Sequence, residues 1–224
     1  MECSFGLTGK DFVLLAADTS AGRSIIQMKD DENKIKALGP HIAMAYGGEA
    51  GDTNNFADFV DRNLRLYQIR NHTPLLPAAA SAWIRRSLAE SLRSRHPYSV
   101  NLMLAGFDIT DSTSHLYWID YLGTKAIVPY AAHGLGQYLA LSTMDKWWTE
   151  GVDKREGIEI LKKCVDEVGK RSTLKFKFNC ILIDASGIHH INLDSSDPIA
   201  EMEQAGKAAE VINPNPPLDV GITA

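Results

Sequence analysis

The residues of this sequence that could support acyl-transfer chemistry lie within its first 50 positions. An unbroken apolar run, Phe12 to Ala17, leads directly into Asp18, so this carboxylate emerges from a buried strand. A buried carboxylate without a partner is costly, and we expect Lys34 to be its cationic partner. A second apolar run, His41 to Tyr46, leads through glycines that include Gly48 into a helical pattern. Backbone N–H groups at such a junction can hold an anion or the oxyanion of an acyl-transfer intermediate.

The chain must place these groups with a hairpin at its start. Two short apolar runs flank Thr8-Gly9-Lys10-Asp11, a cluster of turn-forming residues. Residues 4–22 therefore predict a β-hairpin, and its second strand has apolar residues on both faces. Asp18 stands at the end of this strand.

Several further motifs resemble those of one known family. They are the runs Gly48-Glu49-Ala50-Gly51-Asp52-Thr53, Arg93-Ser94-Arg95, Pro97-Tyr98, Asp120-Tyr121-Leu122 and Ala132-His133-Gly134. Together with the hairpin, Asp18 and Lys34, they resemble the proteasome beta subunits of the N-terminal-nucleophile hydrolases. The resemblance extends from about residue 2 to about residue 193, and it points to one beta type of the eukaryotic 20S core particle.

The resemblance also identifies what a catalytic site would need. In active relatives the nucleophile is a threonine that autolysis frees as the first residue, supported by an Asp, a Lys and a glycine N–H. The resemblance implies that Asp18, Lys34 and Gly48 are the supporting residues, with no gaps. It places Glu2 at the nucleophile position, where a carboxylate cannot be activated as a hydroxyl is. Only Met1 precedes Glu2, so we expect no propeptide and a mature chain that begins at one of these two residues.

Two other positions of the catalytic site also differ from active relatives. Those relatives carry Gly-Ser-Gly where this chain has Gly134-Leu135-Gly136, and an Asp followed by a Ser near residues 171–174, where Ser172 stands at the Asp position. Removing the nucleophile from a triad-type enzyme costs roughly 10⁶ in rate. The resemblance therefore implies a non-catalytic subunit in which Asp18, Lys34 and Gly48 remain as vestigial, structural residues.

The alternative is an active N-terminal-nucleophile peptidase that uses Cys3 or Ser4 after processing. Cysteine is an accepted nucleophile in this superfamily. Because side chains alternate along a strand, Cys3 should point away from Asp18 and Lys34 if Glu2 points toward them. Ser4 lies on the right face, but it would gain a free amine only by cleavage after Cys3.

The composition is that of an ordinary globular protein. The chain has 224 residues, of which 45% are hydrophobic and 23% charged, and this length suits one layered domain. Its formal net charge of −5 argues against nucleic acid as a main partner, because phosphate binding needs a clustered basic face. We see no secretory signal and no run long enough to span a membrane, so we expect no membrane association. Three widely spaced cysteines, Cys3, Cys164 and Cys180, favour reduced, buried thiols.

Hydrophobic periodicity predicts strands, two helices, strands, two helices and strands. We expect the first helix to begin at Asp52 or Thr53, which could cap it, and the second to run from Pro77 through Arg93 and Arg95. Helices in consecutive pairs fit an α+β, four-layer αββα sandwich of two antiparallel sheets covered by helix pairs. The specific topology, that of the N-terminal-nucleophile hydrolase fold, is what the resemblance implies. The other expected elements are helices at 135–148 and 154–170 and strands at 24–28, 100–107, 115–119, 124–132, 176–183 and 188–193.

The last 30 residues have a different character. Apolar residues become sparse after residue 194, and Asn213 to Pro217 cannot form a regular helix or ladder. We therefore predict a beta-type domain at residues 1–194 and an extended or disordered tail at 195–224, or a tail that orders on a neighbouring subunit.

Other side chains have a simpler structural explanation. The acidic run Asp30-Asp31-Glu32 is expected to be a solvated loop rather than a metal site, and His189-His190 to point to opposite faces of a strand. His133 is expected in a turn or interface, and Trp147-Trp148 in the core plus an interface. We expect no metal and no cofactor.

The resemblance implies a structural and assembly subunit of the 20S proteasome beta ring that supports ATP- and ubiquitin-dependent degradation by active neighbours. The implied partners are the other alpha and beta subunits of a 28-subunit particle and, indirectly, regulatory caps, in the cytoplasm and nucleus. A free-standing binding module would need a pocket or basic groove, to which the sequence does not point.

Overall fold

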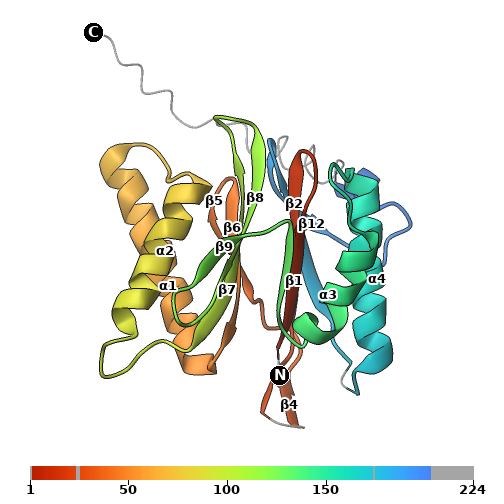
Figure 1. Cartoon of the computed structure of the whole chain (residues 1–224), viewed down its shortest axis with the longest axis horizontal. Coiled ribbons are helices and arrows are strands. Elements are labelled where there is room, and N and C mark those ends of the chain that lie inside the picture. Colours follow the sequence, from red (N-terminus) through yellow and green to blue (C-terminus); the bar gives the residue numbers. More distant parts are fainter. Residues whose placement is uncertain (1, 24–25, 174, 203–224) are drawn as a thin grey trace.

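The chain forms four layers. A computed structural model describes residues 2–23, 26–173 and 175–202. Two five-stranded antiparallel sheets pack face to face, helices α1 and α2 cover the outer face of one sheet, and α3 and α4 cover the other (Figure 1). The αββα sandwich predicted from the sequence is confirmed.

The first sheet carries the N-terminal hairpin at its centre. Its strand order is β10-β1-β2-β11-β12, and every residue of β2 is buried. The hairpin predicted at residues 4–22 is therefore present, and its second strand is covered on both faces. The strands are β1 (Cys3–Thr8), β2 (Phe12–Asp18), β10 (Tyr130–Gly134), β11 (Phe178–Asp184) and β12 (Gly187–Ile191).

The second sheet has the order β5-β6-β7-β8-β9. Its central strand, β7, pairs with β6 so that Gly48 lies opposite Val100. Because Gly48 is the last residue of β6 and Val100 the first of β7, the glycine junction lies at one end of these strands. The strands are β5 (Ile35–Gly39), β6 (Ile42–Gly48), β7 (Val100–Asp108), β8 (Thr113–Ile119) and β9 (Lys125–Ile127).

Three apolar clusters fill the spaces between the layers. The cluster between the two sheets contains Val13, Leu15 and Ala17 of β2, whereas Leu14 and Ala16 face the helices α3 and α4. This alternation explains why an unbroken apolar run is needed in β2. The helices are α1 (Ala50–Asn71), α2 (Pro77–Ser91), α3 (Gly136–Trp147) and α4 (Lys154–Arg171).

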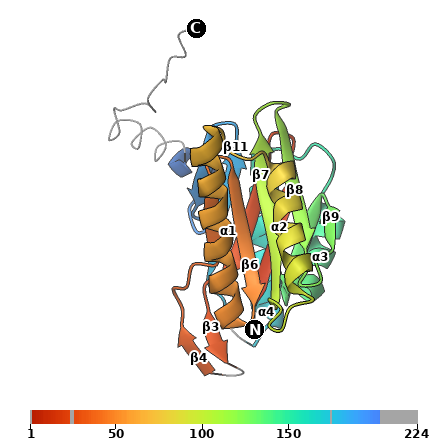
Figure 2. The ribbon, with the colours of Figure 1, turned by 90° about the vertical axis from the view of Figure 1, so that its left-hand side faces the viewer.

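A small hairpin projects beyond the ends of the sheets. It consists of β3 (Ala21–Arg23) and β4 (Ile26–Lys29), and Figure 2 shows it below the four layers. The sequence predicted a strand here but not the pairing with β3. All four residues of β4 are exposed, including Ile26 and Met28.

The strand expected at residues 124–132 is wrong as a single element. The structure divides it at Pro129 into β9, which pairs with β8, and β10, which pairs with β1 in the other sheet. Proline cannot donate a ladder hydrogen bond, and its carbonyl instead accepts one from the Thr8 N–H at 2.7 Å. The segment therefore carries the chain from one sheet to the other.

Two expected helix ends are also wrong. Helix α1 begins at Ala50 and has Glu49 as its N-cap without a side-chain cap, while the Asp52 carboxylate accepts a hydrogen bond from the Ser99 N–H at 3.0 Å. Helix α2 ends at Ser91, so Arg93 and Arg95 lie beyond its last turn and do not serve as helix-terminal cations. Helix α1 thus begins earlier than expected, whereas α2 ends earlier, where the backbone turns before Arg93.

The beginning of the expected tail is packed rather than extended. Residues 198–202 are helical, and Met202 is 7% exposed in the cluster beneath α4. Ile199 packs against the same cluster because it lies one helical turn before Met202. Asn213 to Pro217 lie outside the described residues, and the domain boundary at residue 194 stays a prediction.

Cys3, Cys164 and Cys180 are buried, unpaired thiols, as expected. Among the helices that the structure describes, none is long and apolar enough to cross a membrane.

Candidate functional site

Asp18 lies at the end of β2 and is the centre of a buried polar network. Its side chain is 1% exposed, and its Oδ2 lies 2.8 Å from Lys34 Nζ, so the predicted ion pair is present. The Lys34 ammonium also donates to the Ser20 carbonyl at 2.6 Å. The carboxylate accepts two backbone hydrogen bonds, from the Cys3 N–H at 2.9 Å and the Ser20 N–H at 3.1 Å. Asp18 thus joins the start of β1, the end of β2 and the segment before β5.

Glu2 and Gly48 form the second half of the site. The Gly48 N–H donates to Glu2 Oε1 at 2.6 Å, across 46 positions of sequence. Gly48 has φ of 141°, and a Cβ at this position would lie 2.1 Å from the Ser99 carbonyl oxygen, so only glycine fits. A Cβ on Gly47 would lie 2.2 Å from Glu2 Oε2. The amide that the resemblance assigns to an oxyanion therefore holds the carboxylate of Glu2.

The environment of Glu2 disfavours its charge. Burial raises the pKa of the Glu2 carboxyl, and the Gly48 N–H and the Lys34 ammonium oppose that rise. The charge of Asp18 acts in the same direction as burial. Two carboxylates thus share the influence of one lysine, with Glu2 directly before β1 and Asp18 at the end of β2.

The Gly134-Leu135-Gly136 segment contacts the same end of β1 through its backbone. The Leu135 N–H donates to the Glu2 carbonyl at 2.8 Å, and Gly134 has φ of 64° with its Cα directly against that carbonyl. The Leu135 side chain packs against the apolar cluster beneath α3 and α4. The backbone of this segment thus positions Glu2, while the side chain offers no hydroxyl.

Ser172 terminates α4, where its N–H donates to the Val168 carbonyl at 2.8 Å. Leu174, the end of the region compared with active relatives, lies outside the described residues.

The thiol of Cys3 is not placed as a nucleophile. Cys3 is fully buried in the apolar cluster under α3 and α4, so its thiol is packed among apolar side chains. Burial, with a smaller contribution from the charge of Asp18, raises the pKa of the thiol to about 12. Because the thiolate is the reactive form, burial and the raised pKa both disfavour a nucleophilic role for this thiol.

Ser4 lies one position further along β1, on the face toward the other sheet. It is 7% exposed, and it pairs in register with Ala17 and His133. Within the part of the chain that the structure describes, its hydroxyl makes no hydrogen bond to Asp18 or Lys34.

His133 lies between the sheets, so its expected place in a turn or interface is wrong. It is 3% exposed, its Nε2 lies 3.0 Å from the Leu102 carbonyl oxygen, and its ring stacks on Trp118 with centroids 5.1 Å apart. Burial lowers the pKa of its imidazole to about 4. Its Nδ1 has no hydrogen-bond partner among the described residues. The position of His133 in β10, facing inward, could not be read from the motif alone.

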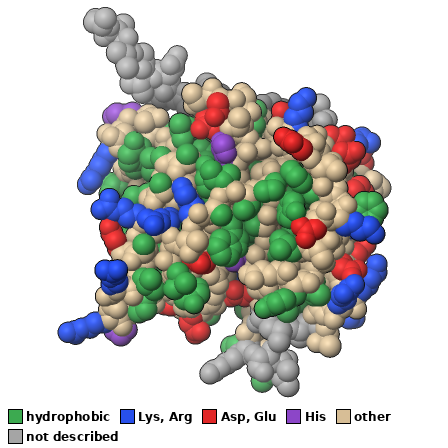
Figure 3. Space-filling view, in the orientation of Figure 1, with side chains coloured by type: hydrophobic (Ala, Val, Ile, Leu, Met, Phe, Trp, Pro, Cys, Tyr) green, Lys and Arg blue, Asp and Glu red, His purple; other side chains and the backbone are tan. Residues whose placement is uncertain are grey.

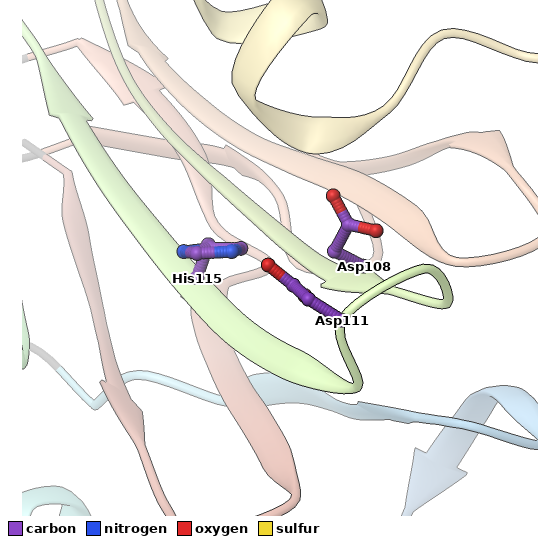
Figure 4. A group of neighbouring side chains, drawn as sticks. All are labelled: Asp108, Asp111 and His115. Carbon is purple, nitrogen blue, oxygen red and sulfur yellow. The ribbon is translucent and has the colours of Figure 1, made fainter.

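Acidic clusters elsewhere belong to turns and surface pairs. Asp108, Asp111 and His115 have potential ligand atoms within 4.8 Å of one another, but Figure 4 shows Asp111 pointing toward His115 while the Asp108 carboxylate turns away. The Thr113 N–H donates to Asp111 at 3.1 Å and the Thr110 N–H to Asp108 at 2.8 Å, and these bonds close the β7–β8 turn.

The acidic run before Lys34 consists of surface pairs. Lys177 Nζ lies 2.6 Å from Asp30 Oδ2, and Lys29 Nζ lies 3.4 Å from Asp31 Oδ1.

The histidine pair of β12 divides as predicted. His189 Nε2 lies 2.7 Å from the Ser186 hydroxyl, beside Asp184, whereas His190 is exposed. Lys154 and Ser186 hold the pKa of the Asp184 carboxyl at about 2 despite its burial.

Comparison of the sequence with known proteins points to one family. A family model described as Proteasome subunit covers residues 2–183. The chain is 42% identical over 203 residues to the Probable proteasome subunit beta type-4 of Neurospora crassa, covering 90% of this chain and 100% of that protein. It is 39% identical over 193 residues to the Proteasome subunit beta type-4 of Saccharomyces cerevisiae, covering 86% and 98%. It is 44% identical over 171 residues to the Proteasome subunit beta type-2-A of Arabidopsis thaliana, covering 76% and 83%.

These relatives agree with the expectation drawn from the hairpin, the Asp18–Lys34 pair and the glycine junction. The family model includes Glu2, Asp18, Lys34 and Gly48, and the aligned relatives span nearly all of the two sheets and four helices. The chain belongs to the proteasome subunit family.

Proposed function

We propose that this chain is a non-catalytic structural and assembly subunit of the 20S proteasome beta ring. Family membership implies assembly with other proteasome subunits. The finer proposal is a place in a particle of about 28 alpha and beta subunits, in the cytoplasm and nucleus, with regulatory caps as indirect partners. Neighbouring active subunits would perform the ATP- and ubiquitin-dependent degradation that this chain supports. Nucleic acid, a membrane and a cofactor have no part in this proposal.

The contact between Glu2 and the Gly48 N–H is the observation that carries the non-catalytic role. The Glu2 carboxylate stands where active relatives have the attacking threonine hydroxyl. The same carboxylate accepts the hydrogen bond of the Gly48 N–H, which would otherwise be available to stabilise an oxyanion. The Glu2 side chain thus accounts for both losses, that of the nucleophile and that of the free oxyanion donor. Asp18, Lys34 and Gly48 then act as structural residues that hold the ends of β1, β2 and β6 together.

Exposed apolar residues support an assembled state. Figure 3 shows apolar side chains gathered over the middle of one face, where both sheets end at β9 and β10. Exposed strand edges beside apolar side chains are typical of surfaces that other chains cover. Ile127 at the end of β9 is 67% exposed, and Tyr138 near the start of α3, the helix that follows β10, is 79% exposed.

Labelling with an electrophile directed at N-terminal threonine tests the proposal. In the purified particle we expect label on other beta subunits and none on this chain. Glu2→Thr is expected to remain unlabelled as well, although it frees the Gly48 N–H. Met1 would still block the amine of residue 2 unless it is removed, Leu135 offers no supporting hydroxyl, and Ser172 stands where the resemblance places a supporting carboxylate. The measurement is mass spectrometry of each separated subunit after labelling. Label within the first four residues of the unmodified chain would establish a peptidase that uses Cys3 or Ser4 and would reject the non-catalytic role.

A further inference from the structure

A groove with an unusual combination of side chains lies on the outer surface between α3 and α4. Its volume is about 420 Å³. On the α3 side it is lined by Lys146 and Trp147, and on the α4 side by Lys163, Lys170 and Arg171. The groove is remote in sequence from Asp18 and Gly48, and the site described above uses none of its residues.

Trp147 forms the exposed apolar floor of this groove. It is 46% exposed, although a large aromatic side chain gains by being covered. The ammonium of Lys163 lies 4.1 Å from the centre of its ring, and that of Lys146 lies 5.1 Å away. These contacts place two cations beside the indole, and each ammonium has three N–H donors.

The groove carries an excess of positive charge in a chain whose net charge is −5. Four cations line it, against the two carboxylates of Asp166 and Glu167, and Glu167 already pairs with Arg171. Among the described residues, no carboxylate lies within 4 Å of Lys146 or Lys163. Cations without acidic partners beside an exposed indole favour a ligand that offers both carboxylates and an apolar side chain.

We propose that this α3–α4 groove binds an acidic segment of another proteasome subunit. Carboxylates of the segment pair with Lys146 and Lys163, and an apolar side chain next to them covers Trp147. The proposal rests on the assembled particle proposed above, and it adds the chemistry of one partner contact. A peptide suits the groove better than a nucleic acid because the basic residues form one short patch and the chain as a whole is negatively charged.

A photoreactive phenylalanine in place of Ser142 tests which segment lies in the groove. Ser142 is exposed and lines the groove, so this probe leaves the tryptophan and both lysines intact. After irradiation of the purified particle, we expect a cross-link to one subunit, at a peptide that contains at least two Asp or Glu residues. A cross-link to a peptide without acidic residues, to nucleic acid, or to no partner in the intact particle would overturn the proposal.

Charge variants of the same probe-bearing chain test the role of the lysines. Replacing both Lys146 and Lys163 by Gln should weaken the cross-link, and replacing both by Glu should reduce it about tenfold, since like charges would then face each other. Lys10→Glu is the matched control, because Lys10 is exposed at the β1–β2 turn outside the groove.

The outcomes separate this proposal from the proposed function. If the unmodified chain fails to purify within a multisubunit particle, the proposed function fails. If it purifies in the particle but the double Glu variant cross-links as strongly as the Lys10→Glu variant, only the proposed groove contact is rejected. Circular dichroism and thermal melting of the double Glu and Lys10→Glu variants show whether a loss of cross-linking comes from unfolding. If the double Glu variant is unfolded, the cross-linking yield of the double Gln variant tests the role of the two lysines.

Discussion

Replacing Asp18 by alanine is expected to destabilise the chain by about 3 to 5 kcal/mol, because it leaves a nearly buried charge without its partner. Lys34 is 12% exposed, and its ammonium would keep only the Ser20 carbonyl. The Cys3 and Ser20 N–H groups would also lose their acceptor. Urea unfolding of the purified chain and its yield in the assembled particle measure the loss.

A double variant at this site should be milder than Asp18→Ala only if it keeps an acceptor for the backbone N–H groups. Replacing Asp18 and Lys34 with apolar residues removes the buried charges but still leaves the Cys3 N–H without an acceptor. Asp18→Asn combined with Lys34→Met keeps one acceptor and should therefore be much milder than Asp18→Ala. Glu90→Ala, which breaks the exposed pair with Arg86, is the matched control and should cause no measurable change. Equal stability of Asp18→Ala and the parent chain would show that the pair is solvated.

Acidification is expected to lower the free energy of unfolding because His133 titrates. Burial holds the pKa of its imidazole at about 4 in the folded chain, against 6.5 for the unperturbed group. The unfolded chain therefore binds the proton more readily, and the stability is fully present above pH 6.5 and declines as pH falls toward 4. The loss should reach about 2 kcal/mol at pH 5 and about 3 kcal/mol when complete.

His133→Gln isolates this effect, because its amide can still donate to the Leu102 carbonyl but does not titrate. Urea unfolding of the parent chain and the variant between pH 4.5 and 7.5 gives the comparison. The parent should lose more stability than the variant across this range. Glu2 titrates in the opposite sense, since its raised pKa makes the folded chain hold its proton more tightly, and this contribution is common to both chains. Parallel pH profiles would contradict the prediction.

Much of the site could be predicted from the sequence because its parts are local. The apolar run of β2 identified a strand covered on both faces, and it ends at Asp18. The glycines of the junction identified backbone N–H groups that could hold an anion, and the Gly48 N–H donates to the Glu2 carboxylate. Both features depend on a few consecutive residues. The resemblance then joined them to Lys34 and Glu2.

Other predictions failed where the pattern of one segment was compatible with two arrangements. Residues 126–132 are a nearly continuous apolar run, but β9 and β10 lie in different sheets because the chain crosses over at Pro129. Met202 follows a stretch with few apolar residues, and it is buried because α4 offers an apolar surface beside it. Neither outcome is encoded within the segment itself.

The sequence alone determined the αββα layers, the buried strand that ends at Asp18 and the loss of a hydroxyl at position 2. Only the tertiary structure decided that the Glu2 carboxylate occupies the Gly48 N–H, that His133 is sealed between the sheets, and that Lys163 comes to lie over Trp147. The physical reason is that periodicity reports which face of an element is buried, whereas contacts across many positions depend on how the elements pack.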